Sequence, residues 1–152
     1  LSVSRTEAQE YVDRYFEKYP GVKVYMEQTQ AFADEKGYVE TIFGRRLYLP
    51  EIRSGNAMVR KAAQRTAINA PMQGSAADII KLAMIDIHRE IPRLNLKSKM
   101  VLQVHDELVF DVHISEKEIV QKIVKNIMEN IYNTKVPLKV EIGFGTNWLE
   151  AH

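Results

Sequence analysis

The stretch that decides the fold is residues 100–112, MVLQVHDELVFDV. Apolar residues dominate its two arms, 100–104 and 108–112, and His105, Asp106 and Glu107 separate them. Two short apolar runs around a polar centre predict a β-hairpin with its turn at 105–107. Tight hairpins prefer Asn-Gly, Asp-Gly or Gly-X because their turns need positive φ, and none of these pairs is present. We therefore expect this tip to serve chemistry rather than turn formation alone.

Composition narrows the class of protein. The chain has 152 residues, 45% of them hydrophobic, which is enough for the core of one domain or two small units. It contains no cysteine, so disulfides and thiolate metal sites are excluded. No apolar run approaches the roughly 20 residues that span a bilayer, and no signal peptide is visible. The chain begins at Leu1 inside a polar, helix-like pattern, so we expect it to be a segment of a longer polypeptide.

Positive charge is concentrated in one region. The net charge is only +1, but residues 41–75 hold six basic side chains against the single acid Glu51, a local balance of +5. The rest of the chain then carries −4. A basic stretch within a neutral chain is compatible with a phosphate-binding face, and its alternative is an ordinary solvated surface. The basic residues are Arg45, Arg46, Arg53, Arg60, Lys61 and Arg65.

The first third of the chain predicts a helical hairpin. Ser4 and Glu7 form a capping-box pattern, Pro20 ends the first helix or opens the second, and Gly37 is placed to cap the second. The first helix carries an aromatic stripe, which we expect to be core rather than a ladder for base stacking. The stripe consists of Tyr11, Tyr15 and Tyr19.

The remainder predicts short strands and longer helices. Residues 38–42 and 47–49 read as a β-ribbon, and a helix from Ala57 should break or kink near Pro71. The next helix, about 75–91, is apolar on most of its circumference and is expected deep in the fold. Ser115 is a plausible N-cap for a further helix, and residues 138–142 read as a third strand of the hairpin sheet. The fold class is α+β, with an antiparallel sheet covered by helices.

Asp106 is the best candidate metal ligand in the chain. Magnesium prefers hard oxygen ligands, and a site with two metal ions needs more than one carboxylate. Glu107 is adjacent, but consecutive residues of a regular strand point to opposite faces. A further carboxylate is therefore required, and no residue of the chain is obviously placed to supply it. Without other information a charged tip is more often a solvated turn.

Four stretches, in order, resemble family A DNA polymerases, the bacterial DNA polymerase I family. They are GYVETIFGRRLYLP at 37–50, QRTAINAPMQGSAADIIKLAM at 64–84, LQVHDELVF at 102–110 and VPLKVEIGFGTNW at 136–148. The resemblance covers nearly the whole chain. It implies an antiparallel palm sheet with covering helices, preceded by a helical hairpin and a small β-ribbon from the fingers. The implied subdomains are partial fingers at 1–55 and the C-terminal part of the palm at 56–152.

The resemblance also implies roles at the tip. Asp106 would bind metal, Glu107 would be an accessory carboxylate and His105 would lie close to the primer terminus. The implied partners are primer-template DNA and deoxynucleoside triphosphates, with two Mg²⁺ ions in the intact enzyme. The partner aspartate and the helix that binds the triphosphate would precede this region, so the isolated chain is expected to be inactive.

A second group of residues is implied to bind DNA. Arg65, Asn69 and Gln73 are four residues apart, which puts them on one face of a continuous helix, although Pro71 weakens this argument for Gln73. They match family residues that touch the primer-template near its end. Amide and guanidinium donors suit minor-groove acceptors, which are nearly the same for every base pair. The alternative for Asn69 and Gln73 is helix termination and capping around Pro71.

The remaining basic residues of the 41–75 stretch, Arg45, Arg46, Arg53, Arg60 and Lys61, are candidate contacts to backbone phosphates. His88 and His113 are expected to be structural or solvated. Two other functions stay open: a segment of a single-subunit RNA polymerase, and a nucleic-acid-binding module without activity. The resemblance further implies a monomer in the bacterial cytoplasm with no membrane partner.

Overall fold

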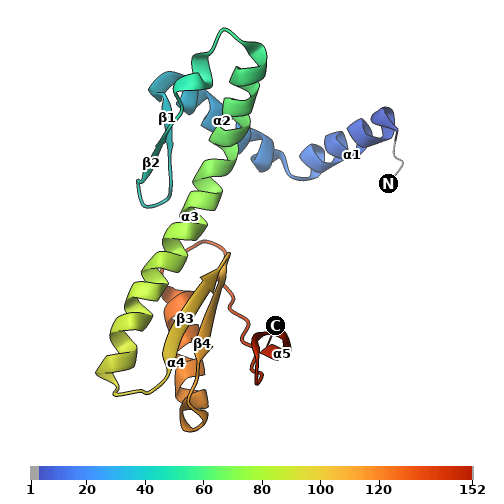
Figure 1. Ribbon diagram of the computed structural model, residues 1–152. Helices are drawn as coiled ribbons and strands as arrows, with labels where there is room; N and C mark the ends of the chain where they lie inside the picture. Colours follow the sequence, from blue (N-terminus) through green and yellow to red (C-terminus); the bar gives the residue numbers. More distant parts are fainter. Residues whose placement is uncertain (1–3, 152) are drawn as a thin grey trace. The chain divides into compact units, whose positions relative to one another are not determined.

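The computed structural model describes residues 4–151 (Figure 1). Packing divides the chain into two compact units, Leu1–Gly74 and Ser75–His152, and helix α3 (Ala57–Arg93) contributes residues to both. Helices combine with two antiparallel sheets of two strands each, so the α+β class is confirmed. The division follows packing within each unit. The predicted subdomain boundary near residue 55 rests on resemblance and stays a prediction.

The first unit opens with two helices whose caps were predicted correctly. Helix α1 (Arg5–Lys18) begins at Ser4, whose hydroxyl accepts from the Glu7 N–H at 3.3 Å while Glu7 accepts from the Ser4 N–H at 2.9 Å. Pro20 opens helix α2 (Pro20–Lys36), where its missing N–H costs nothing. Gly37 ends α2 with φ 76°, and its N–H donates to the Ala33 carbonyl at 2.8 Å.

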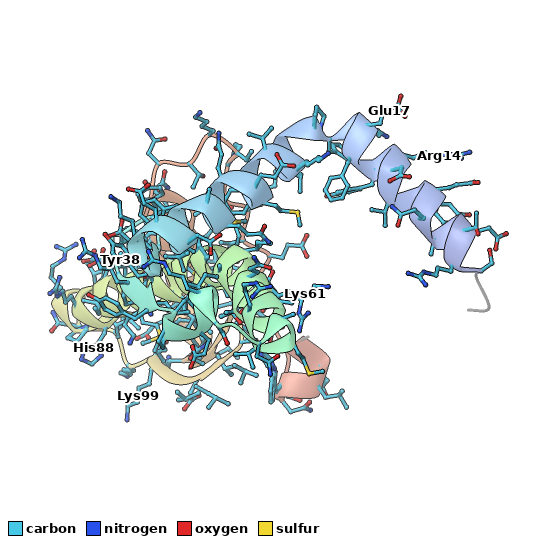
Figure 2. The ribbon with its side chains drawn as sticks, turned by 90° about the horizontal axis from the view of Figure 1, so that it is seen from above. Arg14, Glu17, Tyr38, Lys61, His88 and Lys99 are labelled. Carbon is cyan, nitrogen blue, oxygen red and sulfur yellow. The ribbon has the colours of Figure 1, made fainter. Side chains whose placement is uncertain are left out.

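The aromatic stripe of α1 is not core, contrary to the prediction. No residue of α1 is buried, and Tyr11, Tyr15 and Tyr19 are 66%, 49% and 47% exposed. Arg14 and Glu17 project outward from the same helix (Figure 2). Helical spacing identifies a side that is able to pack, but burial also needs a surface to pack against. Among the described residues, too little surface packs against α1 to bury this side of it.

A β-ribbon packs on the rest of the first unit. Strands β1 (Tyr38–Glu40) and β2 (Arg46–Tyr48) pair antiparallel, with Val39 opposite Leu47. The predicted polar loop after them contains the short 3-10 helix η1 (Pro50–Arg53). Buried side chains from α2, the ribbon, η1 and the first half of α3 form one core. Its members are Ala33, Val39, Leu49, Ile52, Ala63 and Ala67.

The prediction near Pro71 was a break or a kink. The break is wrong, because α3 runs without interruption for 37 residues, and the kink stays a prediction. Proline in a helix interior removes one backbone bond and costs about 3 kcal/mol. Side chains from neighbouring elements bond carbonyls on both sides of it. The Tyr25 hydroxyl donates to the Ile68 carbonyl at 3.2 Å, and Arg45 Nη2 donates to the Gly74 carbonyl at 3.1 Å. Together with the burial of Ala67, these contacts hold the helical path.

The second unit is built around the predicted hairpin. Strands β3 (Lys99–Val104) and β4 (Glu107–Asp111) pair antiparallel, and helix α4 (Lys117–Asn130) lies against one face of them (Figure 1). A single turn, η2 (Ile114–Glu116), precedes α4, and helix α5 (Trp148–Ala151) closes the described chain. The core combines buried residues of α3 and α4 with half-buried residues of β4. Its buried members are Ile87, Ile91, Val120 and Val124.

Three expectations for this unit are wrong. Residues 138–142 form no strand, and the Val140 N–H donates instead to the Glu129 carboxylate at 3.0 Å. Alternating apolar residues make a strand possible, but a strand also needs a partner backbone. Ser115 does not cap α4, because η2 intervenes and the Ser115 hydroxyl bonds His113 Nδ1 at 2.8 Å. The 75–91 segment is buried on one side only, since Leu82 is 37% exposed.

Candidate metal and nucleic-acid site

The hairpin tip presents His105 and Asp106 to solvent. The last strand pair is Val104 with Glu107, so the turn has two central residues and Glu107 belongs to β4 rather than to the predicted turn. His105 has φ 51°, in the left-handed region that glycine normally supplies. Histidine is among the few non-glycine residues enriched there. The sequence thus meets the requirement for positive φ without Gly or Asn.

Asp106 is suited to one ligand position for a hard cation. Its carboxylate is exposed on a turn, and it makes no ion pair with any residue in 4–151. Glu107 is half-buried at the first position of β4. Within residues 4–151 no three His, Cys, Asp or Glu side chains lie together as a metal site. The turn therefore offers one exposed carboxylate of the type Mg²⁺ prefers, that of Asp106, and not a complete ligand set among the described residues.

Two surface hollows of the second unit lie elsewhere. One is lined by α4 alone, and the other by residues of α3 and α4 that include Asp86, Arg89 and Ile123. Neither includes His105 or Asp106. The tip is therefore an exposed projection and not the wall of either hollow.

A buried hydroxyl joins the two ends of the hairpin. Ser98, 2% exposed, precedes β3; its hydroxyl donates to a Glu116 carboxylate oxygen at 2.7 Å and accepts from the His113 N–H at 3.0 Å. Glu116 also accepts from the Lys97 N–H, at 2.9 and 3.0 Å to its two oxygens. The Lys97 N–H and then the Ser98 hydroxyl lower the pKa of the Glu116 carboxyl below its usual value. Sequence reasoning missed this brace, because its members are 15 to 19 residues apart.

Arg65, Asn69 and Gln73 lie on one exposed face of α3. All three are solvent-exposed, and the helix is continuous through them, so the spacing of four places them in a row. Their side chains form no hydrogen bond with another residue of the described chain. Helix termination around Pro71, the alternative for Asn69 and Gln73, is wrong because no helix ends there.

The other basic residues of the 41–75 stretch differ in their hydrogen-bond partners within the protein. Arg53 donates to the Asp34 and Glu35 carbonyls at 2.6 and 2.8 Å, and Arg60 donates to the Ser54 carbonyl at 2.6 Å. Both guanidinium groups therefore satisfy backbone carbonyls. The Lys61 side chain, by contrast, is exposed (Figure 2).

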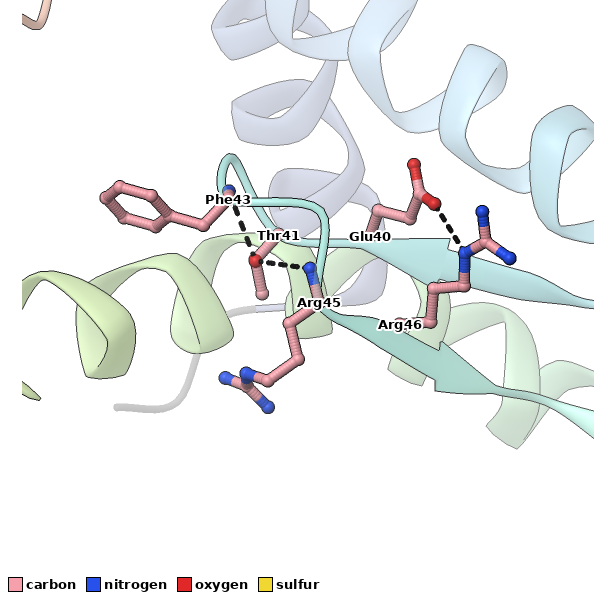
Figure 3. A network of polar contacts seen from close by, with 5 residues as sticks. All are labelled: Glu40, Thr41, Phe43, Arg45 and Arg46. Carbon is pink, nitrogen blue, oxygen red and sulfur yellow. Dashed lines mark hydrogen bonds and ion pairs between the residues drawn. The ribbon is translucent and has the colours of Figure 1, made fainter.

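Two further arginines flank the ribbon turn. Arg46 pairs with Glu40 at 2.7 Å (Figure 3) and lies over the Tyr38 ring at 4.5 Å. The Arg45 side chain instead donates to the Gly74 carbonyl of α3. His88 and His113, expected to be structural or solvated, are both exposed, and the His113 ring bonds the Ser115 hydroxyl.

Comparison with known proteins places these residues in a family. The model of DNA polymerase family A matches residues 1–150. DNA polymerase I of Pseudomonas aeruginosa is 55% identical over 152 residues, all of this chain and 17% of that protein. DNA polymerase I of Caldicellulosiruptor bescii is 50% identical over 99% of this chain and 18% of its own length. The chain thus spans less than a fifth of these relatives.

Structural comparison gives the same result. The polymerase domain of Pol1 from M. smegmatis, solved in complex with DNA primer-template and dNTP, matches with a TM-score of 0.96. That match has 45% sequence identity and covers 98% of this chain and 26% of the other. None of the helices in the part of the chain described here is both long and apolar enough to cross a membrane. Sequence and structure agree that the chain belongs to DNA polymerase family A.

Proposed function

We propose that this chain is a segment of a DNA-directed DNA polymerase that extends a primer with deoxynucleoside triphosphates. The observation that carries the proposal is the match, over 98% of the chain, to a polymerase domain solved with DNA primer-template and dNTP. In this proposal residues 1–55 are part of the fingers and 56–152 are the C-terminal part of the palm. The relatives described above are DNA polymerases, which favours DNA synthesis over the RNA polymerase alternative. The proposal includes a monomer in the bacterial cytoplasm.

Asp106 is the proposed metal ligand. Its exposed carboxylate provides a hard oxygen, and a second carboxylate would come from polymerase sequence outside this chain. When bound, two Mg²⁺ ions would stabilise charge on the attacking and leaving oxygens of an in-line displacement. Glu107 at the start of β4 is the proposed accessory carboxylate, and His105 the residue beside the primer terminus.

The exposed row of Arg65, Asn69 and Gln73 is the proposed contact to the primer-template. Amide and guanidinium N–H groups donate to purine N3 and pyrimidine O2, which nearly every base pair presents in the minor groove. Such contacts depend on the position of a base pair more than on its identity, as copying requires. Lys61, exposed and one turn before Arg65, is a proposed contact to a backbone phosphate.

Binding to a short primer-template duplex tests the nucleic-acid surface. Fluorescence anisotropy with the 152-residue chain should show binding that weakens as salt rises, with a slope of about 0.9 per phosphate contact. Arg65→Ala should lower both affinity and slope. Lys122→Ala, which removes an exposed charge from α4, is the matched control. Affinity that does not change between low and moderate salt would contradict the proposal.

Primer extension tests the catalytic assignment. The isolated chain with Mg²⁺, primer-template and dNTPs should incorporate no nucleotide, because it supplies one carboxylate of the pair. Incorporation that depends on Asp106 would show a complete site and refute this part. In a polymerase chain that contains the segment, Asp106→Ala should abolish incorporation and change DNA affinity much less.

A further inference from the structure

The turn of the β1–β2 ribbon approaches α3 closely at Gly74. Arg45 Nη2 donates to the Gly74 carbonyl at 3.1 Å (the turn residues are drawn in Figure 3). A Cβ added to Gly74 would lie 2.7 Å from Thr41 Cγ2 and 3.3 Å from Arg45 Nη2. The first distance is too short for two carbon atoms, so the approach depends on the absence of a side chain at Gly74.

Thr41 cannot easily turn its methyl group away. Its hydroxyl accepts from the Phe43 N–H at 3.3 Å and from the Arg45 N–H at 3.2 Å (Figure 3). Its backbone N–H donates to the Arg45 carbonyl at 2.9 Å, and its carbonyl accepts from the Gly44 N–H at 2.9 Å. Rotation about χ1 would give up both bonds of the hydroxyl, so the methyl group stays directed at Gly74.

We infer that Thr41 and Gly74 form a steric lock that holds the Arg45 guanidinium at α3, where it contacts a backbone phosphate of the bound nucleic acid. The inference rests on the proposed function for its ligand. Thr41 and Gly74 are positioning residues, and Arg45 is the binding residue. We call the close approach of the Thr41 methyl group to Gly74 the Thr41–Gly74 lock.

The placement of Gly74 favours a phosphate contact over a base contact. Gly74 follows Gln73 by one residue, about 100° around the helix, so Arg45 approaches beside the row formed by Arg65, Asn69 and Gln73. A minor groove is about 6 Å wide, with sugar-phosphate backbone along each side. If Asn69 and Gln73 face the minor groove, a cation held beside their row is near the sugar-phosphate backbone of the DNA. Guanidinium suits phosphate because it presents paired N–H donors.

A double-mutant cycle tests the lock. Gly→Ala inside a helix normally stabilises, but Gly74→Ala should lower the midpoint of thermal unfolding by about 4 °C or more, the shift expected from a small steric cost in a unit of this size. Thr41→Ser keeps the hydroxyl and removes the methyl group. Adding Thr41→Ser to Gly74→Ala should therefore restore the midpoint. If Gly74→Ala stabilises the chain, or if its effect is the same with Ser at position 41, the lock is refuted.

Salt-dependent DNA binding tests the role of the lock. Arg45→Ala should lower the slope of log affinity against log salt by about 0.9, the loss of one phosphate contact. Gly74→Ala should lower it by a similar amount, and Gly74→Ala with Thr41→Ser should restore it, while Lys122→Ala leaves it unchanged. If Arg45→Ala lowers the slope and Gly74→Ala does not, Gly74 has no positioning role. If the unmodified chain does not bind DNA, both the proposed function and the phosphate contact are refuted. The double-mutant cycle in thermal unfolding would still show whether the Thr41–Gly74 lock exists.

Discussion

Ser98→Ala should loosen the hairpin that carries Asp106. The Ser98 hydroxyl is 2% exposed and makes two bonds, donating to Glu116 at 2.7 Å and accepting from the His113 N–H at 3.0 Å. These bonds tie the residue before β3 to the segment after β4. Alanine removes both and leaves the part-buried His113 N–H without this acceptor.

The cost follows from what each bond contributes. A hydrogen bond adds about 0.5–1.5 kcal/mol net, and more when one partner is charged. Two such bonds at a buried serine give about 2 kcal/mol for Ser98→Ala, since alanine leaves almost no cavity. A change of about 2 kcal/mol is roughly a 30-fold change in an equilibrium constant.

Amide hydrogen exchange followed by NMR measures this loss of stability at the hairpin itself. In Ser98→Ala the amides of β3 and β4 should exchange about 30-fold faster than in the unmodified chain, if the hairpin opens as one cooperative unit. Ser115→Ala is the control, because its exposed hydroxyl bonds only the His113 ring among the described residues. Exchange in Ser98→Ala that matches Ser115→Ala would refute the brace as a source of hairpin stability.

Three further predictions concern stability. Ile87→Ala, at a site with no exposed surface, should cost about 2–5 kcal/mol in chemical unfolding, whereas Leu82→Ala, 37% exposed, should cost much less; equal costs would contradict the described core. Gly37→Ala should cost about 1 kcal/mol, because φ 76° disfavours any side chain, and no loss would argue against that cap. The lowered pKa of Glu116 stabilises the folded chain fully above the ordinary value of 4.5, and this contribution disappears as pH falls through the lower folded pKa. Glu116→Gln should reduce the loss of stability measured in acid titration; an unchanged pH profile would contradict the assignment.

Local signals predicted the parts of the fold that depend on neighbours in sequence. The capping box of Ser4 and Glu7 needs residues only three apart, and Gly37 needs only a left-handed terminus, so both were read correctly. The hairpin around Asp106 was also correct, because its two arms are adjacent in the chain. Its turn proved one residue shorter, since the left-handed conformation of His105 leaves no local signature.

Predictions failed where distant residues decide the outcome. Pro71 predicts a break from its own chemistry, but bonds from Tyr25 and Arg45 to carbonyls on either side are invisible in the local pattern. Residues 138–142 alternate like a strand, but no sequence pattern shows whether a partner backbone is present. The row at Arg65, Asn69 and Gln73 was correct as geometry because helical spacing alone defines it.

The backbone of His105 affects how mutations at the tip must be interpreted. A β-branched residue such as Val tolerates φ near 51° poorly, whereas Asn and Gly accept it. His105→Val would therefore move the neighbouring carboxylate as well as delete the imidazole. In a polymerase chain that contains the segment, lost activity of that variant would have two causes that cannot be told apart. His105→Asn keeps the left-handed backbone and removes only the imidazole ring. Of the two variants, only His105→Asn therefore tests the side chain without changing the backbone.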